Sequence, residues 1–286
     1  MASLREIKDR IGSVRSTLKI TSAMKLVASA KLRKAQQAVA AAIPYRDSLS
    51  RVLSALLADY AAKEHEGGTP WDAFSAEKEG GRVALVAIAS NSSLCGGVNA
   101  NAIRGASAVL AEAPDAAVFS IGRKMAEAMR KAGHPSPKDY SKLSERPSYS
   151  GAAAIVDELT EGFLDGRYSR VEIVYNHFAS TGSQPTVRET LLPFKAEETA
   201  AGAADCIVEP DTGAVLSELI PRVLRFRLYS VLLDSAAAEH AARTVAMQTA
   251  TDNGEEILRD LTLEYNKGRQ QKITAEILDI VGGSMI

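Results

Sequence analysis

The sequence predicts a mixed α/β protein in which two long helical ends pair as an antiparallel coiled coil around a central α/β domain. Three observations support this prediction. The N-terminal segment carries an apolar residue about every 3.5 positions, the C-terminal segment is nearly free of proline, and valine-rich runs alternate with helical patterns between them. With 286 residues, 46% hydrophobic and 24% charged, the chain has the composition of a soluble globular protein.

The N-terminal segment, residues 1–60, is expected to form one long helix. Alternating steps of three and four residues lead from Leu4 to Tyr60 through seventeen positions, of which fourteen are apolar. Such a repeat keeps one seam of a helix against a single partner helix and imposes a left-handed supercoil. We therefore expect residues 1–60 to lie along another helix.

The C-terminal segment, residues 212–286, is the expected partner. From Leu216 to Ile280 it contains only Pro221 as a helix breaker, and its apolar residues fall in a less regular stripe. Gly254 and Gly268 each weaken this helix by about 1 kcal/mol relative to alanine. The simplest arrangement is an antiparallel coiled coil in which each terminal helix covers the seam of the other.

The middle of the chain, residues 82–211, predicts a Rossmann-like α/β domain with a mainly parallel sheet. Short apolar or alternating runs indicate strands, and helical patterns separate them. The strands are expected at 82–90, 116–122, 170–178 and 186–192, and the helices at 98–112, 123–132 and 152–165. Gly133 stands where a C-terminal helix glycine belongs. Residues 61–81, with Gly67, Gly68 and Pro70, are expected to form a linker.

The positive charge of the first helix limits what it can contact. Residues 1–60 hold eleven Lys or Arg and four Asp or Glu, while the whole chain has a net charge of −1. No acidic residue lies between Asp9 and Asp47, which indicates a partner for this basic segment. A membrane-surface helix normally uses Trp or Phe, and none precedes Pro44. Two interpretations of the basic helix remain open: it contacts an acidic protein surface, or its basic face is simply exposed to solvent.

The loop "SNSSLCGGVN", Ser90–Asn99, is the candidate small-molecule site, because it follows the first predicted strand and its glycines open a helix. It matches neither standard phosphate-binding motif. Cys95 lacks a supporting His motif for nucleophilic chemistry, and the ordinary interpretation is a tight turn. The two cysteines, Cys95 and Cys206, have no metal-type spacing and are expected to be reduced. No catalytic residue, cofactor or metal ligand is predicted.

Three stretches resemble one family, the γ subunit of F-type ATP synthase, the central rotor shaft. "LREIKDRIGSVRSTLKITSAMKLVASAKLRKAQ" is similar to its N-terminal helix, and "SLCGGVNA" to the start of its central domain. "RTVAMQTATDNGEEILRDLTLEYNKGRQQKITAEILDIVGG" resembles its C-terminal helix most specifically. The family usually has Asp-Arg-Gly before Leu-Cys-Gly-Gly, where this chain has Asn91-Ser92-Ser93.

The resemblance implies a non-catalytic rotor that turns inside a ring of α and β subunits and couples transmembrane proton flow to ATP synthesis or hydrolysis on β. Implied partners are the α and β subunits, the ε subunit and the membrane c-ring, with no nucleic acid and no membrane span. The chain would be a peripheral protein on the cytoplasmic face of a bacterial inner membrane, or on the matrix face in an organelle. Implied partner contacts are Lys19, Met24, Lys25, Arg243, Gln248, Arg269, Gln270, Thr274 and Glu276.

Two other classes of function stay open at this point. A small α/β enzyme with an extended coiled coil would use the Ser90–Asn99 loop, and it would bind a nucleotide or turn over a substrate in isolation. A basic coiled-coil adaptor for nucleic acid would show steeply salt-dependent binding.

Overall fold

The computed structural model describes residues 3–61, 70–76, 78, 80–195 and 208–283. The chain divides into two compact units, one made of residues 1–29 and 243–286 and the other of residues 30–242. Helices α1 (Leu4–Ala61) and α7 (Thr212–Gly283) each contribute to both units. The two units are described separately below.

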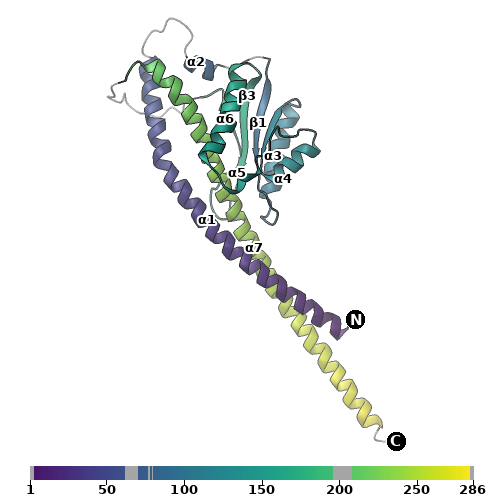
Figure 1. Cartoon of the computed structure of the whole chain (residues 1–286). Coiled ribbons are helices and arrows are strands. Elements are labelled where there is room, and N and C mark those ends of the chain that lie inside the picture. Colours follow the sequence, from purple (N-terminus) through teal and green to yellow (C-terminus); the bar gives the residue numbers. More distant parts are fainter. Residues whose placement is uncertain (1–2, 62–69, 77, 79, 196–207, 284–286) are drawn as a thin grey trace. The chain divides into compact units, whose positions relative to one another are not determined.

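The first unit is an antiparallel pair formed by the start of α1 and the end of α7 (Figure 1). Leu4 lies against Gly268, and Leu18 against Gly254, so residue numbers rise on one helix as they fall on the other. The buried and half-buried positions of α1 up to residue 28 include every expected seam position. On α7 they include residues 244, 247, 251, 254, 258, 261, 265 and 268, which follow the same 3.5-residue repeat. The predicted coiled-coil seam is therefore confirmed in this unit.

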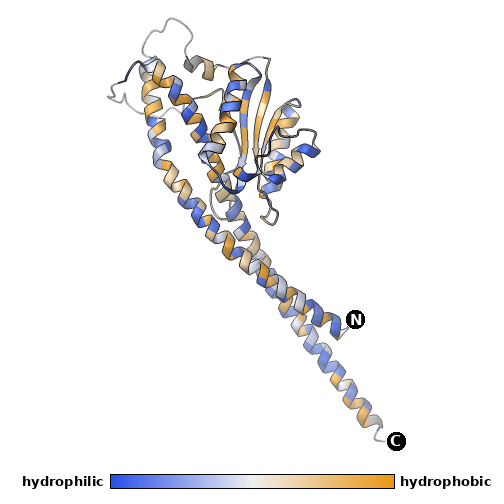
Figure 2. Cartoon of the chain, in the orientation of Figure 1, coloured by the Kyte–Doolittle hydropathy of each residue, from blue (hydrophilic) through white to orange (hydrophobic). Residues whose placement is uncertain are grey.

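The second unit contains a four-stranded sheet in the order β2-β1-β3-β4. Strand β1 (Arg82–Ile88) pairs in parallel with β2 (Ala117–Ile121) and with β3 (Tyr168–Asn176), and β4 (Thr186–Leu192) pairs antiparallel with β3. The central strands are hydrophobic along most of their length (Figure 2). This agrees with the predicted, mainly parallel sheet, whose inner strands are buried on both faces.

Helices cover both faces of the sheet. Helix α3 (Val98–Glu112) and helix α4 (Arg123–Lys131) share one hydrophobic cluster with alternate residues of β1. Ala84, Val86 and Ile88 of β1 join a larger cluster with α6 (Tyr149–Leu164), the start of α7 and the end of α1. Leu53, Leu56 and Tyr60 of α1 are buried in that second cluster.

The division into compact units runs through both terminal helices. Residues 30–61 and 212–242 belong to the compact unit that holds the sheet, because their apolar side chains cover one of its faces. Only residues before 30 and after 242 form the separate helical pair. The long helices thus serve as coiled coil at one end and as domain core at the other.

Two short helices were not expected from the sequence. Helix α2 (Pro70–Ser75) lies inside the predicted linker, residues 61–81, of which 62–69 are outside the described residues. Phe74 of this helix is buried in the core, and its carbonyl accepts a hydrogen bond of 2.8 Å from the Phe194 N–H. Helix α5 (Ser141–Glu145) follows α4. Both are too short to show a helical period, so tertiary contacts decide their conformation.

Candidate functional site

The paired helices bring together two of the residues that the family resemblance singled out. Lys25 Nζ of α1 donates a 2.9 Å hydrogen bond to Gln248 Oε1 of α7. Gln248 Nε2 in turn donates to Asp252 Oδ1 at 2.7 Å. Next to this pair in the seam, Thr251 Oγ1 of α7 donates a 3.1 Å hydrogen bond to Thr21 Oγ1 of α1. The result is a polar cluster across the seam where a coiled coil is otherwise apolar, and such polar pairs fix register.

Sequence reasoning had named Lys25 and Gln248 but not Thr21, Thr251 or Asp252. Thr21 occupied a seam position among apolar residues, and that break in the pattern was the available signal. Its partner could not be found, because the less regular C-terminal stripe did not fix the register. Lys19 is exposed on α1, whereas Met24 and Arg243 are half-buried.

The other implied contacts lie on the end of α7, beyond the reach of α1. Because Leu4, near the start of α1, lies against Gly268, every residue with a described side chain after Gly268 is exposed. The exposed set includes the implied contacts Arg269, Gln270, Thr274 and Glu276, of which Glu276 pairs with Lys272 at 3.8 Å. It also includes five large apolar residues, Ile273, Ile277, Leu278, Ile280 and Val281. Apolar side chains gathered on a helix in water mark a surface that another protein covers.

The positive charge at the start of α1 stays unneutralised within the first unit. Across the described part of this unit, no ion pair forms at five cations of α1, namely Arg5, Lys8, Arg10, Arg15 and Lys19. Residues 1–29 carry six basic and two acidic side chains. The helical pair therefore presents a basic face together with an apolar end, which suits an acidic protein partner with an apolar contact region.

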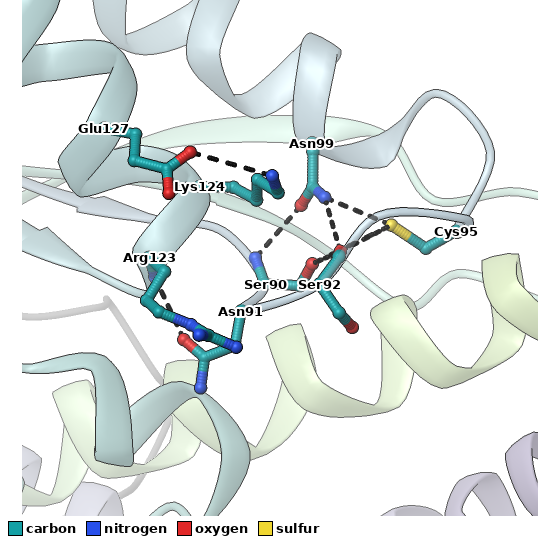
Figure 3. Close-up of polar contacts among 8 residues, drawn as sticks. All are labelled: Ser90, Asn91, Ser92, Cys95, Asn99, Arg123, Lys124 and Glu127. Atoms are coloured by element: carbon teal, nitrogen blue, oxygen red, sulfur yellow. Dashed lines mark hydrogen bonds and ion pairs between the residues drawn. The ribbon is translucent and has the colours of Figure 1, made fainter.

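Polar groups of the Ser90–Asn99 loop form hydrogen bonds with one another (Figure 3). Asn99 accepts the Ser90 N–H at 3.0 Å and donates to the Ser92 carbonyl at 3.1 Å and to Cys95 Sγ at 3.2 Å. Asn91 Oδ1 accepts the Arg123 N–H at 3.0 Å at the start of α4. Asn91 is one of the three residues that differ from the Asp-Arg-Gly usual in the family, and its hydrogen bond joins the loop to α4.

The same loop leaves no room for a nucleotide. The cavity beside it, lined by Ser90, Val98 and Asn99 among others, has a volume of about 10 Å³, which holds about one water molecule. Cys95 is 1% exposed and packs with Val98 and Ala242. His177, one of the four histidines of the chain, is bound to Asp234 at 2.6 Å. The geometry gives no support to the enzyme hypothesis at this loop.

No cluster of three or more His, Cys, Asp or Glu side chains in the described part of the chain is arranged to hold a metal ion. Among the helices of the described ranges, none combines the length and the hydropathy that crossing a membrane requires.

Comparison with known proteins agrees with the arrangement of the helices and the sheet. The ATP synthase family model matches residues 3–285. The ATP synthase gamma chain of Phocaeicola vulgatus is 48% identical over 295 residues and covers all of both chains. That of Bacteroides fragilis is 45% identical over 296 residues, again over the whole of both chains.

Solved structures share the fold at low sequence identity. A chain of the rotor of the Euglena gracilis mitochondrial ATP synthase superposes with a TM-score of 0.64 at 19% identity, covering 94% of this chain and 98% of that one. A chain in another rotational state of the same enzyme gives 0.65 at 20% identity, covering 99% and 93%. Together, the family model over almost the full length and the close relatives show that this chain belongs to the ATP synthase gamma chain family.

Proposed function

We propose that this chain is the central-stalk rotor subunit of an F-type ATP synthase, turning inside a ring of α and β subunits to couple proton flow to ATP synthesis or hydrolysis. The observation that carries the proposal is the antiparallel pair of terminal helices, whose outer surface is basic along α1 and apolar along the end of α7. Membership in the gamma chain family supports it.

The proposed role needs no catalytic group on this chain. ATP would be made or hydrolysed on the β subunits, and the rotor would act by touching each of three equivalent sites differently. Shifting a two-state site from 1:99 to 99:1 requires about 5.5 kcal/mol of differential interaction. Charge-assisted hydrogen bonds, each about 1.5–3 kcal/mol, supply that amount from a few contacts.

The partner contacts follow the surfaces described above. Lys19, Met24 and Lys25 would face an acidic segment of a β subunit, because they lie on the basic part of α1. Arg269, Gln270, Thr274 and Glu276 would make polar contacts with β from the end of α7. Arg243 and Gln248 would belong to the adjoining helical network, which agrees with the Lys25–Gln248 hydrogen bond. The ε subunit and the membrane c-ring would contact the unit that holds the sheet.

In this assembly the chain would be a peripheral membrane protein on the cytoplasmic face of a bacterial inner membrane. The bacterial relatives support that placement. The assembly would also provide the cover that the exposed apolar end of α7 lacks in the isolated chain.

Reconstitution tests the proposal. The chain is mixed with α and β subunits, and the complex is assayed for composition and ATP hydrolysis, with a bead on the chain to record rotation. We expect one copy of this chain per ring of three α and three β, with ATP-driven rotation of the bead. A chain that remains monomeric in this mixture, or a complex whose bead stays still during hydrolysis, would contradict the rotor role.

A further inference from the structure

The second unit contains a large cavity whose lining includes none of the implied partner contacts. It has a volume of about 760 Å³ and lies between α1, the end of β3, the segment after β4, and α7. That volume is within the range of sites that bind small molecules. The cavity shares no residue with the paired-helix surface or with the Ser90–Asn99 loop.

The walls of the cavity are largely apolar. Leu53 of α1, Phe194 after β4, and Phe226 and Val231 of α7 line it and are each less than 8% exposed. The Tyr45 ring meets the Phe226 ring edge-on, with their centroids 4.7 Å apart, and so joins α1 to α7 beside the cavity. An apolar ligand segment would find contact on several sides here.

The carboxylates that line the cavity already have partners. Glu189 accepts the Tyr175 hydroxyl at 2.7 Å and lies 3.4 Å from Arg227. Asp234 binds His177 at 2.6 Å and accepts the Phe178 N–H at 3.1 Å. The third carboxylate, that of Asp47, forms an ion pair of 3.0 Å with Arg46. The cavity therefore holds no acid in need of a cationic ligand.

Two cations and one hydroxyl of the cavity lining lack an oppositely charged or hydrogen-bonding partner of this kind among the described residues. Within the described residues, Arg51 makes only a 3.3 Å hydrogen bond to Ser48 Oγ, and Lys195 has no ion pair there. Ser230 Oγ is buried and has no hydrogen-bond partner within the described part of the chain. An unpaired buried hydroxyl costs about 1–3 kcal/mol, so a ligand atom that binds it is favoured.

We propose that this cavity binds a single-chain amphiphile with an anionic head, such as a fatty acid or a lysophospholipid. The acyl chain would lie against Leu53, Phe194 and Phe226. The carboxylate or phosphate would accept hydrogen bonds from Arg51 and Lys195, which are donors suited to those groups. The lining includes no catalytic group and none of the implied partner contacts, so occupancy of the cavity can be measured on the isolated chain without ATP synthase activity.

Calorimetric titration of the 286-residue chain with palmitate, with lysophosphatidate and with hexadecanol tests the proposal. Both anionic probes should bind at one per chain. Hexadecanol, which has the same chain length as palmitate but no charge, should bind at least tenfold more weakly. If palmitate binds and lysophosphatidate does not, the head is a carboxylate, and the reverse result assigns a phosphate.

Variants locate the site. Ala42→Phe fills the cavity from α1 and should abolish binding, while the double variant R51A/K195A should weaken it about tenfold or more through lost charge-assisted bonds. Arg33→Ala, an exposed cation of α1 that does not line the cavity, is the matched control and should bind as the parent does. If Ala42→Phe does not fold, the double variant decides alone, because both of its side chains are exposed.

Three results would overturn the proposal. One is the absence of saturable binding of either anionic probe. Another is binding that R33A weakens as much as R51A/K195A does, which would indicate nonspecific attraction to a basic surface. The third is concentration-dependent dimerisation that Ala42→Phe abolishes without any lipid binding, which would show that a second copy covers the cavity.

Discussion

Leu18 of α1 packs so closely on Gly254 of α7 that a Cβ added to the glycine would lie 2.7 Å from Leu18 Cδ2. Sequence reasoning alone counts Gly254 as a weak point in the helix. The structure gives it a positive role, because the absent side chain lets the two helices approach at a seam position.

Gly254→Ala should lower the free energy of unfolding of the helical pair by about 1 kcal/mol. The gain in helix propensity is about 1 kcal/mol, and overpacking against Leu18 costs about 1–3 kcal/mol. Thermal unfolding followed by circular dichroism measures the change. Gly12→Ala is the control, since no atom lies within 4 Å of its added Cβ, and it should stabilise the chain. Equal stabilisation by both substitutions would show that the contact is absent.

Gly122→Ala should prevent folding or greatly lower the denaturant midpoint. Gly122 has a φ of +96°, and an added Cβ would overlap the Ala89 carbonyl oxygen. Gly133 has a φ of +88° with open space around it, so Gly133→Ala should cost only the backbone strain of about 1–2 kcal/mol. Soluble yield and the denaturant midpoint compare the two variants. Similar losses in both would leave the close approach to Ala89 without consequence.

Glu112→Gln should destabilise the chain at neutral pH but not in acid. The Arg188 guanidinium, 2.7 Å away, lowers the pKa of the Glu112 carboxyl below its ordinary value of 4.5. A lowered folded-state pKa stabilises the protein above pH 4.5, and this stabilisation is lost as the pH falls through the folded pKa. Unfolding of parent and variant at several pH values measures the difference, which should shrink below pH 4.5.

The control for that prediction is Glu161→Gln, whose carboxylate makes no ion pair in the described ranges. Its effect on unfolding should be small at every pH. A Glu112→Gln effect that persists unchanged at low pH would mean that the Arg188 pair does not produce it.

Cys95 should resist thiol reagents in the folded chain and react after unfolding. The thiol is 1% exposed and lies 3.2 Å from Asn99 Nδ2, which donates to it. A Cys206→Ser background isolates this thiol, because Cys206 lies outside the described residues. Mass spectrometry after alkylation, with and without denaturant, measures the reaction. Rapid alkylation of the native protein would reopen the nucleophilic interpretation of the loop.

The coiled-coil prediction was right in kind and incomplete in register. The repeat on residues 4–28 alone identified the buried face of α1, because a helix in contact with one partner must keep one stripe apolar. The partner residues Gly254 and Gly268 could not be assigned, since a glycine carries no hydropathy signal. Their role depends on the side chains of Leu18 and Leu4, which reach them only in the folded pair.

By itself, the sequence determined the two long helices, the mainly parallel sheet and the family, because each depends on a periodic pattern or a motif that lies within one stretch of chain. Only the tertiary structure decided which parts of those helices pair with each other and which cover the sheet. It also decided that polar groups of the Ser90–Asn99 loop form hydrogen bonds with one another, and that Arg51 and Ser230 line one cavity. These features depend on contacts between residues distant along the chain, and no local pattern encodes such distances.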